Sequence, residues 1–189
     1  MPTVPADPSL DVPPELLEAW ERHPAIVKYG DPVLRKPARP VTRFNAETTR
    51  LIKRMVQIMR DAKGLGLAAP QIGESTRIII YDADEKDGLR VIVNPTILSR
   101  SGEQTEPKEG CLSIPGLQGV VKRANELKVR GYDERNRPVA RRVKGLEARV
   151  IQHEIDHLDG ILFIDRAEEG TLEWAFGDDD EDETAAKAE

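Results

Sequence analysis

The chain of 189 residues contains a single cysteine, and only three of its residues are histidines. One cysteine cannot form an internal disulfide, so the composition favours a reducing compartment. No apolar run approaches the length of about 20 residues that spans a bilayer. The N-terminus also lacks the basic start and apolar stretch of a secretory signal. We therefore expect a cytoplasmic protein with no membrane partner.

The acidic residues are concentrated at one end of the chain. From Ala167 onward there are ten acidic residues and one lysine, a balance of −9, whereas the preceding 166 residues carry 24 acidic and 27 basic groups. Like charges packed this densely indicate disorder, and they oppose binding to nucleic-acid phosphates. We expect residues 167–189 to be a mobile acidic tail that does not dock to RNA, and no specific nucleic-acid partner for the chain.

The rest of the chain divides into a short extension and one domain. Residues 1–24 are rich in proline, and P-E-L-L-E-A-W-E-R-H predicts a short helix that packs through Leu16, Leu17 and Trp20. Residues 25–166 are long enough to bury one core. We see no internal repeat and no sign of a second core.

Periodicity predicts two long helices and several strands. A helix is expected from about Asn45, its N-cap, to Ala62, with Met55 and Met59 in the core; a second runs from near Leu146 to Gly160. Strands are expected at residues 25–27, 77–83, 89–93 and 95–98, a hairpin at 126–132 and 139–143, and a strand or edge segment at 161–166. These elements predict a single α+β domain, with antiparallel or mixed sheets packed around the second helix.

The second helix carries the pattern V-I-Q-H-E-I-D-H-L-D-G at residues 150–160. On a helix, His153 and His157 are four residues apart and share one face, with Cβ atoms about 5–6 Å apart. That spacing suits two ligands of one metal ion, with Glu154 beside them as the base. The alternative is a solvated amphipathic helix in which this spacing arises by chance.

A catalytic metal site of this type takes about three protein ligands. The segment K-E-G-C-L-S-I-P-G holds Cys111 in a charged, glycine-flanked context that is unusual for a core residue. Cys111 is the candidate third ligand, and a buried apolar cysteine is the alternative. His23 lacks a metal-like spacing, and we expect a surface or capping role for it.

Small residues dominate the segment G-L-G-L-A-A-P-Q-I-G at residues 64–73. Gly64 is explained as a helix C-cap, but Gly66, Ala68 and Ala69 are not. Small side chains let another backbone approach closely. The absence of lysine and of a G-x-G-x-x-G spacing disfavours phosphate binding. We therefore expect a loop along which an extended substrate lies.

Three of these segments together resemble the signature motifs of the peptide deformylases. They are G-L-G-L-A-A-P-Q at residues 64–71, E-G-C-L-S at 109–113 and Q-H-E-I-D-H at 152–157, in the usual order and without substitution. The resemblance extends from about Ile26 to Arg166. The N-terminal extension and the acidic tail depart from the family pattern.

The resemblance implies a hydrolase that removes the formyl group from the N-formylmethionine of newly made proteins and releases formate. It implies one divalent ion on Cys111, His153 and His157, with water in the fourth position. The expected ion is Fe(II), for which Zn, Ni or Co can substitute, and ligand type alone does not choose between iron and zinc. N-formylmethionyl peptides are the expected partners, with transient proximity to the ribosome.

The resemblance also implies roles for other residues. Glu154 is expected to move the proton, while the side-chain amide of Gln71 and the backbone N–H of Leu112 stabilise the developing oxyanion. The expected substrate-binding residues are Gly64, Leu65, Gly66 and Gly110.

Three questions stay open at this point. Glu109 and Asp156 are alternative partners for the imidazole N–H groups, or else surface carboxylates. A general H-E-x-x-H metallopeptidase, which usually takes a third histidine or glutamate, is the competing enzyme class. A binding module that has lost turnover is the alternative outside enzymes.

Overall fold

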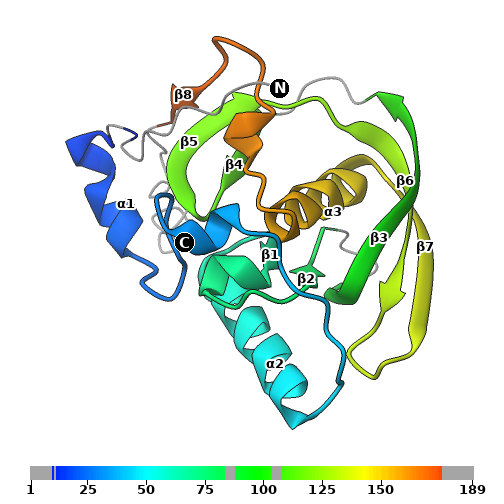
Figure 1. Cartoon of the computed structure of the whole chain (residues 1–189). Helices are drawn as coiled ribbons and strands as arrows, with labels where there is room; N and C mark the ends of the chain where they lie inside the picture. Colours follow the sequence, from blue (N-terminus) through cyan, green and yellow to red (C-terminus); the bar gives the residue numbers. More distant parts are fainter. Residues whose placement is uncertain (1–9, 11, 84–87, 104–107, 176–189) are drawn as a thin grey trace, which may run out of the picture.

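Two antiparallel sheets enclose one helix, α3 (Gly145–Leu158), in the computed structural model of the chain (Figure 1). The structure describes residue 10 and residues 12–83, 88–103 and 108–175. Among these, no helix combines the length and the hydrophobicity needed to cross a bilayer. The predicted single-domain α+β architecture around the histidine-bearing helix is confirmed.

The larger sheet has five strands in the order β1-β2-β3-β6-β7. Their bounds are Gly66–Ala68, Ile78–Tyr81, Arg90–Glu103, Ala124–Tyr132 and Pro138–Lys144. The strand β3 contains the expected strands at 89–93 and 95–98, and two register shifts bend it along β6. The hairpin β6–β7 confirms the predicted hairpin. All four residues of β2 are buried, which explains its continuous run of apolar side chains.

The smaller sheet has three strands in the order β4-β5-β8. Their bounds are Lys108–Cys111, Ile114–Val120 and Glu173–Trp174. The segment 167–175, which the sequence places in the acidic tail, pairs with this sheet: Leu117 pairs with Trp174, and Val121 forms a bridge with Ala167. The rest of the expected tail, residues 176–189, lies outside the described residues.

The predicted helix after Asn45 is α2 (Ala46–Asp61). The Asn45 side chain accepts hydrogen bonds from the backbone N–H groups of Glu47 and Thr48, at 2.9 and 3.1 Å, which makes it the N-cap. Met55 and Met59 are 0% and 1% exposed, so their assignment to the core is confirmed. The remaining helical segments are η1 (Pro14–Leu16), α1 (Leu17–Glu21), η2 (Pro32–Arg35), η3 (Ala69–Ile72) and η4 (Phe163–Asp165).

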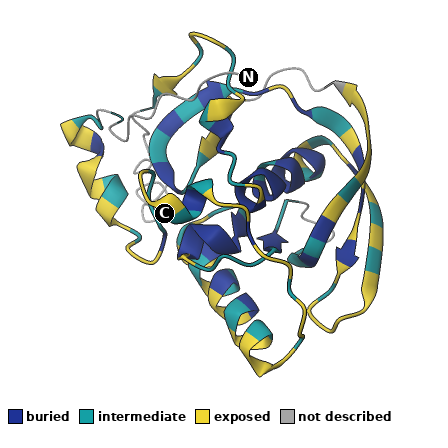
Figure 2. Cartoon of the chain, viewed as in Figure 1, coloured by how far each residue is buried: buried dark blue, intermediate teal, exposed yellow. Residues whose placement is uncertain are grey.

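The helix α3 is buried on most sides, as its dark colour in Figure 2 shows. It packs against β1, β2, β6 and β7, and its apolar side chains join the core cluster beneath the five-stranded sheet. A helix buried in this way carries few solvated positions. Its polar side chains therefore lie inside the protein, where each needs a partner or a function.

Four local expectations were wrong. Residues 25–27 form a turn, because the N–H groups of Val27 and Tyr29 bond to two separate segments, at Gln71 and Ser113, and build no ladder. Residues 161–166 contain η4 in place of a strand, since the Asp165 carboxylate accepts from the N–H of Leu162 and closes a turn.

The other two concern the N-terminal helix and the segment 64–73. Leu17 is 52% exposed, and the short helix packs through Leu16 and Trp20 instead. The segment 64–73 is an edge strand, β1, followed by η3, because Leu67 and its neighbours pair with β2. Its edge position still leaves one side of β1 without a neighbouring strand among the described residues.

Candidate metal centre

The structure brings Cys111, His153 and His157 together. One ligand atom from each lies within 4.8 Å of the other two. Both histidines come from adjacent turns of α3, with ring centroids 4.9 Å apart, and Cys111 comes from the end of β4, where β4 turns into β5. His23 is not part of this group. The predicted ligand set therefore converges at one point, between the helix and the smaller sheet.

The surroundings of the sulfur suit a metal-binding thiolate. The Cys111 Sγ atom accepts from the backbone N–H of Ser113 at 3.4 Å and from Gln71 Nε2 at 3.5 Å. It lies 3.2 Å from His157 Nε2. A thiolate with two imidazoles is a donor set of the kind that binds zinc or iron. The residues present therefore fit a divalent ion.

The pKa values of the two imidazoles are shifted in opposite directions. Burial and the neighbouring ring of His153 lower the pKa of His157 well below its usual value, which favours the neutral, ligating form. Burial also lowers the pKa of His153, but hydrogen bonds with Cys111 and Glu109 outweigh it and raise that pKa well above its usual value.

Glu109 is the carboxylate that orients an imidazole. Its Oε2 atom lies 3.1 Å from His153 Nδ1, and the residue is 6% exposed. Burial raises the pKa of the Glu109 carboxyl, but hydrogen bonds from Arg123 and His153 outweigh it and lower the pKa to about 2. Asp156 contacts arginines and not a histidine. Of the two candidates, Glu109 holds the ring, and neither carboxylate is on the surface.

A buried ionic cluster holds Glu109 in turn. Arg123 donates from Nε and Nη2 to the two oxygens of Glu109, at 2.9 Å each, and from Nη1 to Asp156 at 2.5 Å. Arg149 donates to Glu109 at 2.7 Å, and Arg166 donates to both oxygens of Asp156, at 2.6 and 2.8 Å. Sequence reasoning missed the arginines, because no short motif marks them.

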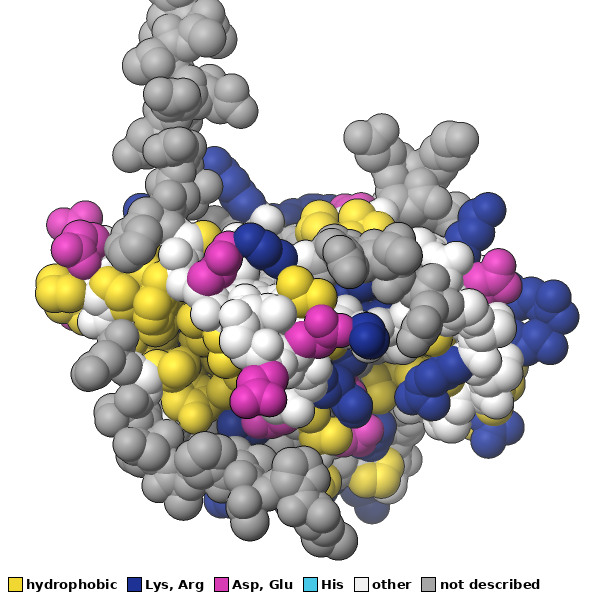
Figure 3. Space-filling view, turned by 90° about the horizontal axis from the view of Figure 1, so that it is seen from above, with side chains coloured by type: hydrophobic (Ala, Val, Ile, Leu, Met, Phe, Trp, Pro, Cys, Tyr) yellow, Lys and Arg dark blue, Asp and Glu magenta, His cyan; other side chains and the backbone are white. Residues whose placement is uncertain are grey.

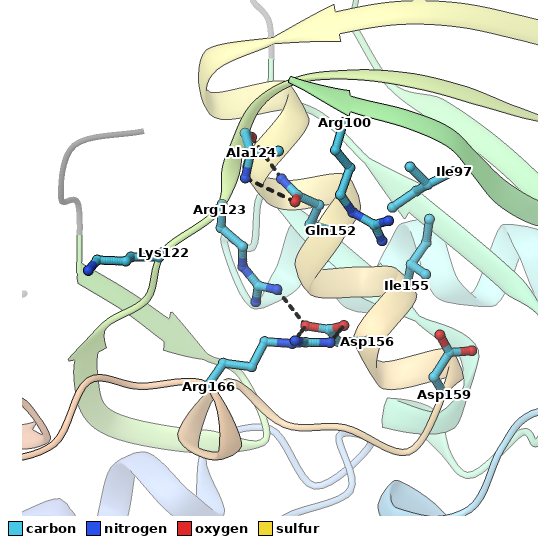
Figure 4. Close-up of a pocket in the computed structure, with 10 residues that line it drawn as sticks. All are labelled: Ile97, Arg100, Lys122, Arg123, Ala124, Gln152, Ile155, Asp156, Asp159 and Arg166. Carbon is cyan, nitrogen blue, oxygen red and sulfur yellow. Dashed lines mark hydrogen bonds and ion pairs between the residues drawn. The ribbon is translucent and has the colours of Figure 1, made fainter. Parts of the chain in front are cut away.

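Figure 4 shows the part of this cluster in which Arg123 and Arg166 both donate to Asp156. A polar pocket of about 270 Å³ opens there, on the side of α3 that carries Gln152 and Asp156. Its lining residues are Ile97, Arg100, Lys122, Arg123, Ala124, Gln152, Ile155, Asp156, Asp159 and Arg166. The metal ligands are not among them, so this pocket is distinct from the metal centre.

Glu154 has a different environment from Glu109. It is 4% exposed, and its Oε2 atom has no hydrogen-bond partner among the described residues. Burial raises the pKa of its carboxyl to about 7; the charge of His153 opposes this effect and that of Glu109 adds to it. A Cβ atom at Gly66 would lie 2.4 Å from Glu154 Oε1, so only glycine leaves room for this carboxylate beside β1.

Gln71 is held in one orientation. Its Oε1 atom accepts from the backbone N–H of Ala68 at 2.8 Å, which directs the Nε2 donor toward Cys111 and Ser113. Leu112 lies in the two-residue turn between β4 and β5, directly after Cys111. Both residues therefore adjoin the sulfur.

The remaining predicted residues border the same region. A Cβ atom at Gly64 would lie 2.8 Å from the Leu112 side chain, so the first and second sequence motifs touch. Leu65 is 49% exposed. Gly110 is exposed on β4, at the edge of the smaller sheet.

Comparison with known proteins agrees with this geometry. Residues 24–172 match the family model described as polypeptide deformylase. The chain is a member of the peptide deformylase family. Its relatives include the peptide deformylase of Pelotomaculum thermopropionicum, 49% identical over 142 residues, covering 75% of this chain and 90% of that protein. That of Acidothermus cellulolyticus is 52% identical over 138 residues, covering 73% and 75%.

Solved structures give the same result. A peptide deformylase from Synechococcus elongatus, in complex with actinonin, has a TM-score of 0.74 and 43% identity over 78% of this chain and 83% of that one. The Thermotoga maritima enzyme has a TM-score of 0.73 and 42% identity, covering 76% and 96%. The chain is accordingly a metal-dependent hydrolase that removes N-terminal formyl groups from nascent peptides, and it carries a Cys-His-His metal-binding group.

Proposed function

We propose that Cys111, His153 and His157 hold one divalent ion, and that Fe(II) is the natural one, with Zn, Ni or Co able to substitute. The observation that carries this proposal is the convergence of the three donor atoms within 4.8 Å, beside the buried Glu154, whose Oε2 atom has no hydrogen-bond partner among the described residues. A bound divalent ion acts as a Lewis acid and lowers the pKa of water. The choice of iron rests on the family resemblance, because thiolate and imidazole also suit zinc.

Glu154 moves the proton. Its carboxylate accepts a proton from the attacking water and then delivers it to the departing amine nitrogen, since one group can serve as base and then as acid. A pKa near 7 suits both steps at neutral pH. Glu109 cannot serve as the proton carrier, because its two oxygens accept hydrogen bonds from Arg123 and Arg149. It holds the His153 ring instead.

Gln71 and Leu112 stabilise the negative charge that develops on the formyl oxygen. The Gln71 Nε2 donor faces the sulfur because Oε1 is anchored to Ala68; its bonds to Cys111 and Ser113 are long, at 3.5 and 3.4 Å. The Leu112 N–H adjoins the sulfur in the β4–β5 turn. Removing one such donor typically lowers the rate by about 10²–10³.

The substrate lies along Gly64, Leu65, Gly66 and Gly110. Supporting this placement, β1 and β4 are the edge strands of the two sheets. A sheet edge offers backbone N–H and C=O groups to an added peptide strand. Leu65 offers an apolar side chain that is half exposed, and the small formyl group is selected by close packing around the metal.

The setting follows from the substrate. N-formylmethionyl chains emerge at the ribosome, so the enzyme acts in the cytoplasm and in transient proximity to ribosomes, without a membrane partner or a specific nucleic-acid partner. We further propose that residues 25–166 form the catalytic domain, that residues 1–24 are an N-terminal extension, and that the acidic tail lies within residues 167–189, of which residues 167–175 pair with the smaller sheet.

Formate release from formyl-Met-Ala-Ser tests the proposal when it is paired with elemental analysis of protein purified without oxygen. We expect turnover and about one equivalent of iron, and loss of both the metal and the activity in Cys111→Ser. A general metallopeptidase would instead cleave internal peptide bonds and would keep its metal without the cysteine. Unchanged metal content and turnover in Cys111→Ser would overturn the proposed ligand set.

A further inference from the structure

Exposed positive side chains line the outer face of the β6–β7 hairpin. Lys128 and Arg130 are exposed on β6, and Arg142 and Lys144 on β7. Alternate residues of a strand point to one face, and the register places Lys128 opposite Arg142. Figure 3 shows Lys and Arg side chains gathered on the right of the molecule, where Figure 1 places this hairpin. We call these four residues the basic face.

Among the described residues of the hairpin, the charges of the basic face have one acidic residue directly opposite them, Glu126 facing Lys144. Like charges that lie directly opposite one another on neighbouring strands are destabilising, and Lys128 faces Arg142 in this way. Within the part of the chain that the structure describes, none of the four side chains forms an ion pair. Glu126 lies opposite Lys144 but accepts from Ser101 Oγ.

The exposed side of α2 also carries basic residues, but there one of them has an acidic partner. There, Arg54 pairs with Glu74 at 3.5 Å, and Asp61 accepts from Gln57. On that helix the basic residues Arg50, Lys53, Arg54 and Arg60 lie between two acidic residues, Glu47 and Asp61. A local pattern that lowers stability without an evident internal gain is expected at a functional surface. The basic face has that character.

We propose that the basic face binds the phosphate backbone of single-stranded RNA. On a sheet, cations two residues apart along a strand are separated by about 6.8 Å, and neighbouring strands by about 4.8 Å. The four charges thus form a flat array that meets successive phosphates without entering a groove. Phosphate contacts of this kind are independent of sequence. The proposal is therefore compatible with the absence of a specific nucleic-acid partner.

An aromatic side chain favours RNA over an acidic protein. Tyr132 is 41% exposed and lies two residues beyond Arg130, on the same face of β6. Aromatic rings on a positive surface stack with unpaired bases, a contact that a carboxylate-rich polypeptide does not use. The Tyr132 ring already meets the Phe44 ring edge-on, with centroids 5.9 Å apart, which fixes its position.

The acidic end of the chain is the competing occupant. Residues 178–183 are six consecutive acidic residues, and the whole chain carries a net charge of −6. At physiological salt the Debye length is about 8 Å, so exposed charges farther away are largely screened. The local array, and not the net charge, then governs RNA binding. This surface also offers a physical basis for the proposed proximity to ribosomes, but it uses none of the residues proposed for deformylation.

Fluorescence anisotropy of the full chain with a labelled mixed-sequence RNA of about 20 nucleotides tests the proposal. Four phosphate contacts predict a slope of log K against log salt of about −2.8 for a single strand, or about a 50-fold loss of affinity between 50 and 200 mM salt. Lys128→Gln with Arg142→Gln should weaken binding at 50 mM salt at least tenfold and make the slope less steep by about 1.4.

The matched control removes the same charge elsewhere. Arg50→Gln with Lys53→Gln, on the exposed side of α2, should bind as the parent does, and so should the charge-conserving Lys128→Arg with Arg142→Lys. Formate release from formyl-Met-Ala-Ser should stay within about twofold in every variant, which separates this inference from the proposed function.

Three results would overturn the inference. One is equal weakening by the control pair, which indicates a general charge effect. The second is RNA binding that appears only after removal of residues 177–189, which makes the tail the occupant of the face. The third is displacement of the RNA by poly-glutamate as effectively as by unlabelled RNA, which indicates an acidic polypeptide partner.

Discussion

Two glutamates beside the same pair of imidazoles have opposite environments. Glu109 is bonded by Arg123, Arg149 and His153, and its pKa falls to about 2. Glu154 is equally buried, yet one of its oxygens has no hydrogen-bond partner among the described residues and its pKa rises to about 7. The first carboxylate is fixed as an anion. The second gains and loses a proton near neutral pH.

The difference matches the two roles proposed for these carboxylates: Glu109, on β4, positions a ring, and Glu154, on α3, moves a proton. A buried carboxylate oxygen without a hydrogen-bond partner is unfavourable, and this one persists because α3 is anchored elsewhere. The anchor is the ionic cluster on the other side, where Arg123 joins Glu109 to Asp156. Glu109 thus holds the His153 ring, while an oxygen of Glu154 stays without a hydrogen-bond partner among the described residues, as the proposed base requires.

Glu154→Gln should have the largest effect on activity. An amide cannot accept the proton, so turnover of formyl-Met-Ala-Ser should fall by about 10²–10⁴-fold or more. Metal content should stay at the parent value, because Glu154 is not a proposed ligand. The melting temperature should not fall, since the change removes the cost of burying a carboxylate that has one oxygen without a hydrogen-bond partner among the described residues. Formate detection, elemental analysis and thermal unfolding measure the three quantities.

Arg123→Met should have the largest effect on stability. It leaves Glu109 and Asp156 each without one buried partner, which typically costs 3–5 kcal/mol. The measurement is the free energy of unfolding in urea. As the control, Arg135→Met on the exposed turn of the hairpin should change stability by less than about 0.5 kcal/mol. Similar values for the two variants would show that the cluster does not anchor the helix.

Glu109 should also give the stability a distinctive dependence on pH. Its folded pKa is depressed from 4.5 to about 2, so its stabilisation is present above pH 4.5 and is lost as the pH falls through about 2. The contribution is roughly 3 kcal/mol. In urea titrations of metal-free protein, the parent should lose about that much more stability than Glu109→Gln between pH 4.5 and 2. Parallel curves would contradict the assignment.

Trp20→Phe should have a small effect, which tests whether the N-terminal extension belongs to the folded unit. The Trp20 indole N–H donates to the Pro115 carbonyl at 3.0 Å, near the Cys111 turn. Losing this hydrogen bond should lower the free energy of unfolding by about 1 kcal/mol. Leu17→Ala, at the exposed position of the same helix, should be nearly neutral. A neutral Trp20→Phe would make the extension an independent appendage.

Local periodicity accounts for what the sequence predicts well. The four-residue spacing of His153 and His157 fixes their common face once the segment is helical, and the same argument places Met55 and Met59 in the core. The convergence of Cys111 with the histidines depends on packing of α3 against the smaller sheet, which no spacing reveals. Its charged, glycine-flanked context made it the candidate third ligand, and the family resemblance supported that assignment.

The features that the sequence analysis did not predict depend on contacts between residues far apart in the chain. Arg123 and Arg149 are ordinary charged residues in the sequence, and only the fold brings them to Glu109. The strand expected at residues 25–27 failed for the same reason, because its apolar residues fill a gap between other segments instead of joining a ladder. A buried face leaves a local periodicity in the sequence, whereas the segments against which that face packs leave none.

The most direct test of the metal centre is the X-ray absorption spectrum of the cobalt-substituted enzyme, recorded beside that of Cys111→Ser. We predict one sulfur and two imidazole nitrogens among the nearest neighbours of the ion, with the sulfur absent in the variant. A parent spectrum without sulfur, or a spectrum that the variant leaves unchanged, would contradict the ligand set from which the account of this site is built.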